Sequence, residues 1–391
     1  MHMSWLDGTG FGLTEDDCTI RQMARAFARK KVAPLAQKID AEHYFPKELL
    51  PELAELGFMG ATVPESLGGS GLTQVQYCLL IEELAAACAS TSIIVSAHSS
   101  LCLAPIVQFG TPEQHEQFAT PLATGKQLGC FALSEPGTGS DAASLTCRYE
   151  AVEDGYIVNG TKNWITNGPE ADACVLFSTS DLHAGYKGVS AFVHRLDLPG
   201  ITRGKHEDKL GICGSPTCAL HYENVKLPKS ALLGEEGKGF NVAMATLNGG
   251  RTGVAAQAVG IARAALEDAL AYAQERKTFG KPICEHQSIK NYLADMMNRV
   301  DASRLLTLSA AFKKDQGLSY IREAAMAKLY ASESASWVAN KAVQIFGGYG
   351  FVKDYPAERH LRDAKITEIY EGTSEIQRLV VADSLLREER N

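Results

Sequence analysis

The fold is decided by the stretch 128–227, which contains the runs Gly155-Tyr156-Ile157-Val158, Cys174-Val175-Leu176-Phe177 and Gly188-Val189-Ser190-Ala191-Phe192-Val193. These runs are short and rich in β-branched and aromatic residues, which is typical of strands. Turn residues separate them at the spacing of an antiparallel sheet. We therefore expect a β-barrel or β-sandwich in the middle of the chain.

Helical periodicity flanks this stretch on both sides. Before it, from Thr14 to about residue 120, apolar residues recur at helical spacing, and Thr14 or Asp16 is placed to cap the first helix. After Gly234 the same period returns in long segments typical of a helical bundle. The apolar stripes consist of Ile20, Met23, Ala24 and Phe27 in the first region and of Ile289, Tyr292, Leu293, Met296, Met297 and Val300 in the second.

These patterns predict an α+β multidomain protein. We expect an N-terminal helical domain at residues 1–120, a middle antiparallel β-barrel or β-sandwich domain at 121–231 and a C-terminal helical bundle at 232–391. Strands and helices do not alternate along the chain, which argues against a doubly wound parallel sheet. The long C-terminal helices have more apolar surface than one bundle needs, which favours contacts between subunits.

Composition narrows the classes of function. The chain has 391 residues, of which 45% are apolar, and a net charge of −8, which disfavours nucleic acid as a partner. Its first residues lack a targeting pattern, and no uninterrupted apolar run approaches the length that spans a membrane. The closest two of the ten cysteines, Cys213 and Cys218, are too widely spaced for a zinc knuckle or a CxxC motif. We expect a soluble protein with reduced thiols, no metal and no membrane partner.

Two glycine-bearing segments in the β-region are candidates for a cofactor site. Neither the glycines at 8–12 nor those at 137–139 form a dinucleotide-binding fingerprint. The segment 131–141, Phe-Ala-Leu-Ser-Glu-Pro-Gly-Thr-Gly-Ser-Asp, ends a strand in a turn whose backbone N–H groups can hold an anion or a ring edge, although a plain turn explains it as well. In the segment 159–168, Trp164 has two interpretations, a platform for a flat cofactor or a core tryptophan.

Three further segments make the combination specific. They are Arg276-Lys277-Thr278-Phe279-Gly280, Gln344-Ile345-Phe346-Gly347-Gly348-Tyr349-Gly350 and Ile369-Tyr370-Glu371-Gly372-Thr373-Ser374-Glu375-Ile376-Gln377-Arg378. In this order, the five segments resemble the acyl-CoA dehydrogenase family over about residues 14–388. The stretches 209–211, Lys-Leu-Gly, and 357–360, Ala-Glu-Arg-His, make the chain similar to butyryl-CoA dehydrogenases. The resemblance implies a helical N-terminal domain, a middle β-domain and a C-terminal four-helix bundle.

The resemblance also implies an activity. Such enzymes are FAD-dependent oxidoreductases of fatty-acid β-oxidation that convert an acyl-CoA, here a short-chain one such as butyryl-CoA, to the trans-2-enoyl-CoA and pass electrons to an electron-transferring flavoprotein. By resemblance Glu371 is the base that removes the α-proton, which requires a pKa raised by burial. Relatives with the base on another helix have a glutamate directly before the equivalent of Arg251, where this chain has Gly250. The backbone N–H of Glu371 and the flavin ribityl chain would stabilise the thioester oxygen.

The remaining site residues follow from the same resemblance. The isoalloxazine would be framed by Phe131, Leu133, Ser134, Trp164 and Thr166, and the phosphates and adenosine would reach a neighbouring subunit near Arg276, Phe279, Gln287, Gln344 and Gly348, with Thr373 and Glu375 completing the FAD site. The acyl-CoA would contact Ser140, Asn248, Arg251, Tyr370 and Gly372, and Ser140 would also lie beside FAD. A cofactor shared in this way predicts a homo-oligomer, in this family usually a tetramer.

Chain-length preference would depend on the pocket floor, which we expect to include residues 94–103. No arginine lies there to pair with a second carboxylate, which disfavours a glutaryl-type substrate. The alternatives are an acyl-CoA oxidase or enoyl-CoA reductase on the same scaffold, a non-catalytic acyl-CoA-binding homologue, and a helical protein without a cofactor. The expected compartment is the bacterial cytoplasm, or the mitochondrial matrix if the chain is a processed form.

Overall fold

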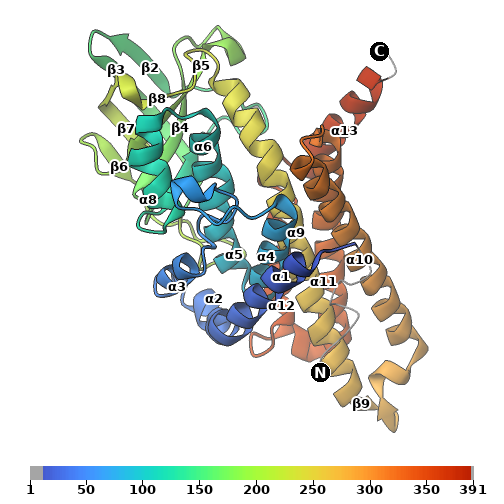
Figure 1. Cartoon of the computed structure of the whole chain (residues 1–391). Helices are drawn as coiled ribbons and strands as arrows, with labels where there is room; N and C mark the ends of the chain where they lie inside the picture. The colour runs from blue at the N-terminus through green and yellow to red at the C-terminus, as the bar shows by residue number, and fades with distance from the viewer. Residues whose placement is uncertain (1–11, 389–391) are drawn as a thin grey trace.

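The computed structural model describes residues 12–388, and the predictions about the targeting pattern and the glycines at 8–12 concern mainly residues that lie outside this range. The β-domain lies at one side of the molecule, and the long helix α9 (Gly239–Glu275) runs from it toward the opposite end (Figure 1). Around α9 lie the N-terminal helices and the remaining C-terminal helices. This order of helices, sheet and helices confirms the predicted fold class.

The N-terminal region is helical, as predicted. Its α-helices are α1 (Glu15–Phe27), α2 (Ala36–Ala41), α3 (Leu49–Glu55), α4 (Gln74–Ala87), α5 (Ala89–Ser96), α6 (Ala104–Phe109), α7 (Pro112–Gln114) and α8 (Thr120–Ala123). Thr14 caps α1 in a capping box, because its hydroxyl accepts from Asp17 N at 3.2 Å and Asp17 Oδ2 accepts from Thr14 N at 2.9 Å. Of the two predicted caps, Thr14 is therefore the correct one.

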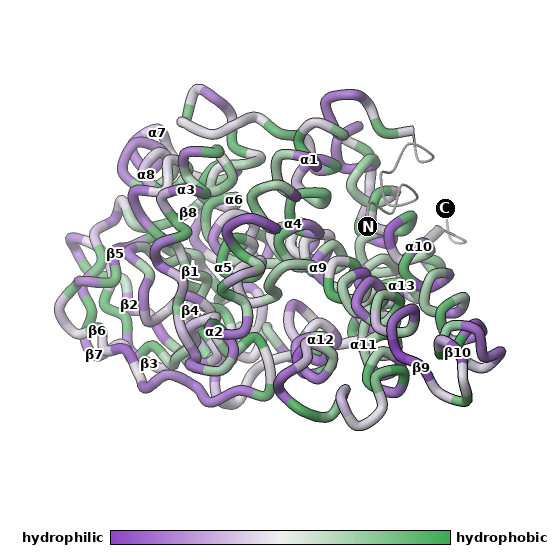
Figure 2. Tube along the Cα trace, turned by 90° about the horizontal axis from the view of Figure 1, so that it is seen from below, coloured by the Kyte–Doolittle hydropathy of each residue, from purple (hydrophilic) through white to green (hydrophobic). Residues whose placement is uncertain are grey.

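The stretch Ala89–Phe109 passes through the interior of the protein. It joins α5 and α6 through a π-helical segment at Ala97–Leu103 and is long and apolar enough to span a membrane by composition alone. However, 72% of its most apolar window is buried inside the protein, which is the pattern of a core helix. Figure 2 places α5 and α9 between the sheet and the outer C-terminal helices. The predicted pocket floor at 94–103 is thus an interior segment.

The β-domain is one eight-stranded sheet. Its strands are β1 (Gly129–Ala132), β2 (Arg148–Val152), β3 (Gly155–Thr166), β4 (Ala173–Thr179), β5 (Val189–Arg195), β6 (Ile201–Arg203), β7 (Thr217–Pro228) and β8 (Leu232–Leu233). Most neighbours are antiparallel, as predicted, but β1 and β2 each pair with β4 in parallel. The hairpin of β2 and β3 lies between β1 and β4 in the chain, so β4 can return beside β1 in the same direction.

The C-terminal region is a bundle of long helices. After α9 and the short strands β9 (Lys277–Thr278) and β10 (Lys281–Pro282) follow α10 (Gln287–Asp315), α11 (Ile321–Phe346), α12 (Ala357–Ile366) and α13 (Ser374–Glu388). The predicted stripe on α10 faces the core, since Met296 and Val300 are buried and its other members pack against the same cluster. The boundaries at 120/121 and 231/232 stay predictions.

A buried cluster of charges joins the N-terminal helices to the bundle. Glu82 and Glu83 of α4 are 3% exposed and accept hydrogen bonds from arginines of three other helices. Arg304 of α10 donates to Glu82 at 2.8 Å, and Arg263 of α9 donates to Glu83 at 2.7 Å. Arg21 of α1 donates to Glu83 at 3.0 Å. The cluster therefore fixes α1, α9 and α10 against α4.

Glu82→Ala is expected to lower the free energy of unfolding by about 3–5 kcal/mol, because it leaves buried guanidinium groups without their carboxylate. The midpoint of chemical denaturation measures this effect. The matched control is Glu52→Ala, which breaks the Lys31–Glu52 pair whose side chains are 42% and 41% exposed, and which should cost less than about 1 kcal/mol. Equal losses in the two variants would contradict a stabilising role for the buried cluster.

Candidate active site

Glu371 lies in the turn between α12 and α13, where the backbone is constrained. Its φ angle is +54°, a left-handed conformation that non-glycine residues rarely adopt, and Gly372 follows with φ +94°. Gln377 of α13 donates from Nε2 to the carbonyl oxygens of Glu371 and Gly372 at 3.2 Å and 2.8 Å. Lys328 of α11 donates to the Gly372 carbonyl at 2.7 Å. The turn is thus held from two helices.

The carboxylate of Glu371 is buried and has no hydrogen-bond partner among the described residues. The residue as a whole is partly exposed, but both carboxylate oxygens are buried, and neither is paired with any group in residues 12–388. Burial raises the pKa of Glu371 to about 7, and the positive charges of Lys328 and Arg251 limit the increase. A carboxylate in this state is a base that ionises near neutral pH.

Helix α9 passes directly beside this carboxylate. A Cβ atom added to Gly250 would lie 2.0 Å from Glu371 Oε2 and 3.0 Å from Leu101 Cδ2. Gly250 therefore leaves the space that the carboxylate occupies. Leu101 belongs to the predicted pocket floor, so this segment does lie next to Glu371.

The two predicted flavin segments of the β-domain are joined to each other. The backbone N–H of Asn163 donates to the Ser134 carbonyl at 2.8 Å. The fully buried ammonium of Lys162 donates to the Leu133 carbonyl at 3.0 Å and to Glu135 at 2.7 Å. Segments separated by about 25 residues in sequence thus form one surface, to which Phe131 and Thr166 contribute half-buried side chains.

Trp164 is not a core residue. The residue is 60% exposed. Its φ angle is +60°, and it lies at an irregularity in the pairing of β3 with β7. Exposure of an indole costs free energy unless something covers it. The core interpretation of Trp164 is therefore wrong, and the interpretation as a platform for a flat ring remains.

The predicted adenosine side has a cavity of its own. Arg276 and Gly348 line a cavity of about 1060 Å³ at the end of the bundle, next to the stacked rings of Tyr272 and Phe346, whose centroids are 4.2 Å apart. Phe279, in the turn between β9 and β10, is 95% exposed. Gln287 and Gln344 are also exposed. Residues of the flavin segments do not line this cavity.

The residues predicted to contact acyl-CoA have different surroundings. Arg251 is 6% exposed and donates to Asn248 Oδ1 at 2.6 Å, while its Nε has no partner in residues 12–388. Tyr370 donates its hydroxyl hydrogen to Gln257 Oε1. Ser140 lies on the surface of the loop after β1. Tyr370 directly precedes Glu371 in the chain, and the charge of Arg251, which is bonded to Asn248, acts on the Glu371 carboxylate. The structure shows no contact that links Ser140 to these residues.

Thr373 and Glu375 stand at the start of α13. The Thr373 hydroxyl accepts from Ile376 N at 3.4 Å, which makes it a cap for this helix, and Glu375 is exposed. A structural role thus accounts for Thr373 within the chain. Their predicted contacts with FAD stay predictions.

Comparison with known proteins identifies the family. Models of the N-terminal, middle and C-terminal domains of acyl-CoA dehydrogenases match residues 14–126, 130–225 and 237–386. The chain belongs to the acyl-CoA dehydrogenase family. It is 50% identical over 379 residues to the mitochondrial short-chain specific acyl-CoA dehydrogenase of Bos taurus, covering 97% of this chain and 92% of that one.

Two solved structures resemble this acyl-CoA dehydrogenase closely. Butyryl-CoA dehydrogenase from Megasphaera elsdenii is 47% identical with a TM-score of 0.94, over 96% of this chain and 99% of that one. A chain of a structure described as the electron transferring flavoprotein of Acidaminococcus fermentans is 46% identical with a TM-score of 0.95, over the same two shares. The resemblance inferred from the five sequence segments is confirmed.

The residues of this acyl-CoA dehydrogenase fit the FAD that the family implies. An exposed indole at Trp164 suits a flat ring, and a cavity with an arginine and exposed backbone at Gly347 and Gly348 suits a phosphate-bearing adenosine. The buried carboxylate oxygens of Glu371 form no hydrogen bond with Trp164 or with the residues of the cavity, which leaves them available to a substrate. The fit to FAD therefore rests on two separate places in the chain, Trp164 and the cavity.

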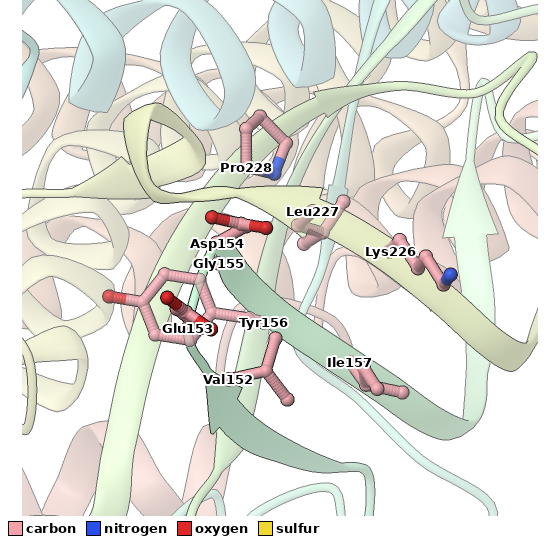
Figure 3. Close-up of a pocket in the computed structure, with 9 residues that line it drawn as sticks. All are labelled: Val152, Glu153, Asp154, Gly155, Tyr156, Ile157, Lys226, Leu227 and Pro228. Carbon is pink, nitrogen blue, oxygen red and sulfur yellow. The ribbon is translucent and has the colours of Figure 1, made fainter.

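A second depression in the β-domain is lined by other residues. It has a volume of about 420 Å³ and is formed by the turn between β2 and β3 and by the end of β7 (Figure 3). Its polar side chains include Glu153, Asp154 and Lys226. None of the predicted site residues lines it, so substitution of one of its carboxylates can serve as a control for substitution of Glu371.

Sequence reasoning missed the residues that hold the Glu371 turn. Lys328, Gln377 and Gln257 are all at most 1% exposed and contact residues 370–372. A signal existed for Lys328, since it interrupts a stripe of alanines on α11 that includes Ala324 and Ala331. A lysine at a core position of a helix needs a partner.

Gly250→Ala is expected to lower kcat for acyl-CoA oxidation at least about tenfold, because the new methyl group would displace the Glu371 carboxylate and a misplacement of 1 Å can cost about 10²-fold. Steady-state rates with an artificial electron acceptor measure this. Gly249→Ala is the matched control on the same helix, since its Cβ would approach the end of the flexible Lys314 side chain, at 3.3 Å. Similar rates for both alanine variants would refute the assigned geometry.

Proposed function

We propose that this chain oxidises a short-chain acyl-CoA, with butyryl-CoA as the expected substrate, to the trans-2-enoyl-CoA in an FAD-dependent reaction. The observation that carries the proposal is the buried, unpaired carboxylate of Glu371 in a turn with left-handed backbone. The names of the bovine and Megasphaera relatives support a short acyl chain. Leu101 of the interior segment 94–103, beside Glu371, supports a pocket of limited depth.

Glu371 would remove the α-proton of the thioester. Such a proton is weakly acidic, so the base has to be positioned and has to ionise near the working pH, and the pKa of about 7 meets the second condition. Bound FAD would supply the acceptor for the β-hydrogen as hydride. In residues 12–388 the backbone N–H of Glu371 has no acceptor, so it is free to donate to the thioester oxygen as negative charge develops.

The middle domain would hold the reactive part of the cofactor. Ser134 and Trp164 come from segments that hydrogen bonds fix to each other, which gives the ring a rigid frame together with Phe131, Leu133 and Thr166. A rigid frame is what hydride transfer requires of the protein, because the distance and angle to the substrate decide the rate.

The adenosine half of FAD would lie on a second copy of the chain. Arg276 and Gly348 line the cavity at the end of the bundle, and Phe279, Gln287 and Gln344 are exposed near it in sequence. Phe279 is 95% exposed, which an isolated subunit would leave in water at a cost. We therefore propose a homo-oligomer, with a tetramer as the expected state.

The remaining assignments concern the substrate and the electron acceptor. Arg251 and Asn248 form a hydrogen-bonded pair on α9 next to Gly250, and Tyr370 and Gly372 flank the base. These residues, with Ser140, would contact the acyl-CoA. The match to the Acidaminococcus structure supports an electron-transferring flavoprotein as the acceptor. The compartment would be the bacterial cytoplasm or the mitochondrial matrix, according to the source.

Glu371→Gln is expected to lower kcat with butyryl-CoA by about 10²- to 10⁴-fold while FAD stays bound, because the amide cannot accept the proton. Anaerobic rates with an electron-transferring flavoprotein and the flavin absorbance of the purified variant measure the two effects. Glu153→Gln, in the depression of Figure 3, is the control and should keep normal rates.

Retention of activity in Glu371→Gln would refute the assigned base. The same assay run in air separates the dehydrogenase from the oxidase on the same scaffold, since turnover sustained by oxygen alone would favour the oxidase.

The pH profile of kcat/KM is expected to rise as the pH increases through about 7. The reason is that Glu371 must lose its proton before it can act as a base, and kcat/KM reports the pKa of the free enzyme. Initial rates at low butyryl-CoA, from about pH 5.5 to about pH 8.5, measure the acid limb. A flat profile over this range, which would place the acid limb near the ordinary glutamate value of 4.5, would show that the base is solvated and would contradict the burial of its carboxylate.

A further inference from the structure

Lys328 is a buried cation beside the proposed base. It lies on α11, is fully buried, and is surrounded on its own helix by Ala324, Ala327 and Ala331, which are also buried. Within residues 12–388 its hydrogen-bond acceptor is the carbonyl oxygen of Gly372 at 2.7 Å, and it forms no ion pair. Burying an ammonium group without a paired carboxylate is costly, and a single carbonyl compensates for little of that cost.

The contact with Gly372 acts on the turn that presents Glu371. The left-handed φ angle of Glu371 costs free energy and persists only if the surroundings hold it. Gln377 donates to the carbonyls of both residues, and Lys328 donates to the second one from the opposite helix. These three hydrogen bonds engage both carbonyls of the turn, and within residues 12–388 none of them uses the amide N–H of Glu371. Lys328 and Gln377 thus share the task of holding the turn.

Of Lys328 and Gln377, Lys328 is the one that also brings charge to the site. The charged groups that act on its ammonium are Glu371, Arg251, Glu368 and Glu375, and those that act on the Glu371 carboxylate are Lys328 and Arg251. Burial lowers the pKa of Lys328 to about 8, and Glu371 opposes that decrease. Conversely, Lys328 counteracts the increase that burial causes in the pKa of Glu371. The two groups therefore favour each other's ionised form.

We infer that Lys328 is a positioning residue for the base: it holds the turn at Gly372 and favours the ionised form of the Glu371 carboxylate. The inference rests on the proposed role of Glu371. Arg251 also acts on the charge of Glu371, but in residues 12–388 its side chain donates to Asn248 and makes no hydrogen bond to the turn at 371–372, so it does not hold the turn. Without the ammonium, the carboxylate would bind its proton more tightly and a smaller fraction of the enzyme would be active at neutral pH.

The test compares pH profiles of the FAD-loaded enzyme with butyryl-CoA. Lys328→Met removes both the charge and the hydrogen bond, and we expect the acid limb of kcat/KM to move by roughly one pH unit to the alkaline side, with an activity loss of about fivefold at pH 7 that recovers as the pH is raised. Recovery follows because the Glu371 carboxylate of the variant loses its proton once the pH exceeds its further raised pKa.

Gln377→Met is the matched control. It removes a donor to the same Gly372 carbonyl but no charge, so it should lower kcat at every pH and leave the acid limb where it is in the wild type. If both variants lose activity uniformly with pH, Lys328 has only a structural role and the inference is wrong. Lys328→Arg, which keeps the charge, should restore the wild-type acid limb in any molecules that bind FAD.

Two further comparisons keep the result clear. If Lys328→Met does not fold, Lys328→Gln supplies the uncharged variant with a polar side chain, and its acid limb should move in the same direction. An unshifted limb in Lys328→Gln would overturn the inference. Glu371→Gln tests the proposed function separately. Full activity in that variant would refute Glu371 as the base. Inactivity of Glu371→Gln together with an unshifted acid limb in Lys328→Gln would refute only the role of Lys328.

Discussion

The whole site depends on one carboxylate kept out of water without a partner. Burying Glu371 costs free energy, and the cost appears as a pKa of about 7 instead of the ordinary value near 4.5. The protein bears this cost by fixing the turn between α12 and α13 through Lys328 and Gln377, and by leaving space for the carboxylate at Gly250. Helices α9, α11 and α13 thus together determine the position of the Glu371 carboxylate.

The rest of the architecture keeps those atoms in place. Helix α9 contributes Gly250 and Arg251 to the site, and the same helix is fixed at Arg263 to the glutamates of α4. A displacement of α4 would therefore also move α9, and with it Gly250 and Arg251 in the active site. On the other side, the buried pair of Lys162 and Glu135 ties the two flavin segments together. Rigid elements surround the site, which is the arrangement that proton and hydride transfer need.

Much of the fold could be predicted from sequence because it follows local periodicity. The cap at Thr14 and the stripe on α10 were both found in this way. The parallel pairing of β1 with β4 was not, because it depends on contacts between distant segments. Trp164 was ambiguous, since exposure is a property of the folded chain. The alanine stripe marks Lys328 as a buried cation, but its role was missed, because its partner is a backbone carbonyl that carries no sequence signal.

The close approach of Gly250 to Glu371 has a consequence for how such an enzyme can change over generations. The two positions compete for one small volume, since even a methyl group at position 250 would overlap the carboxylate. Acquiring a side chain at one position is therefore tolerable only after the other has become small. Substitutions at the two sites are strongly epistatic, and a lineage that relocates its acidic group must pass through an intermediate with either an empty pocket or an overfilled one.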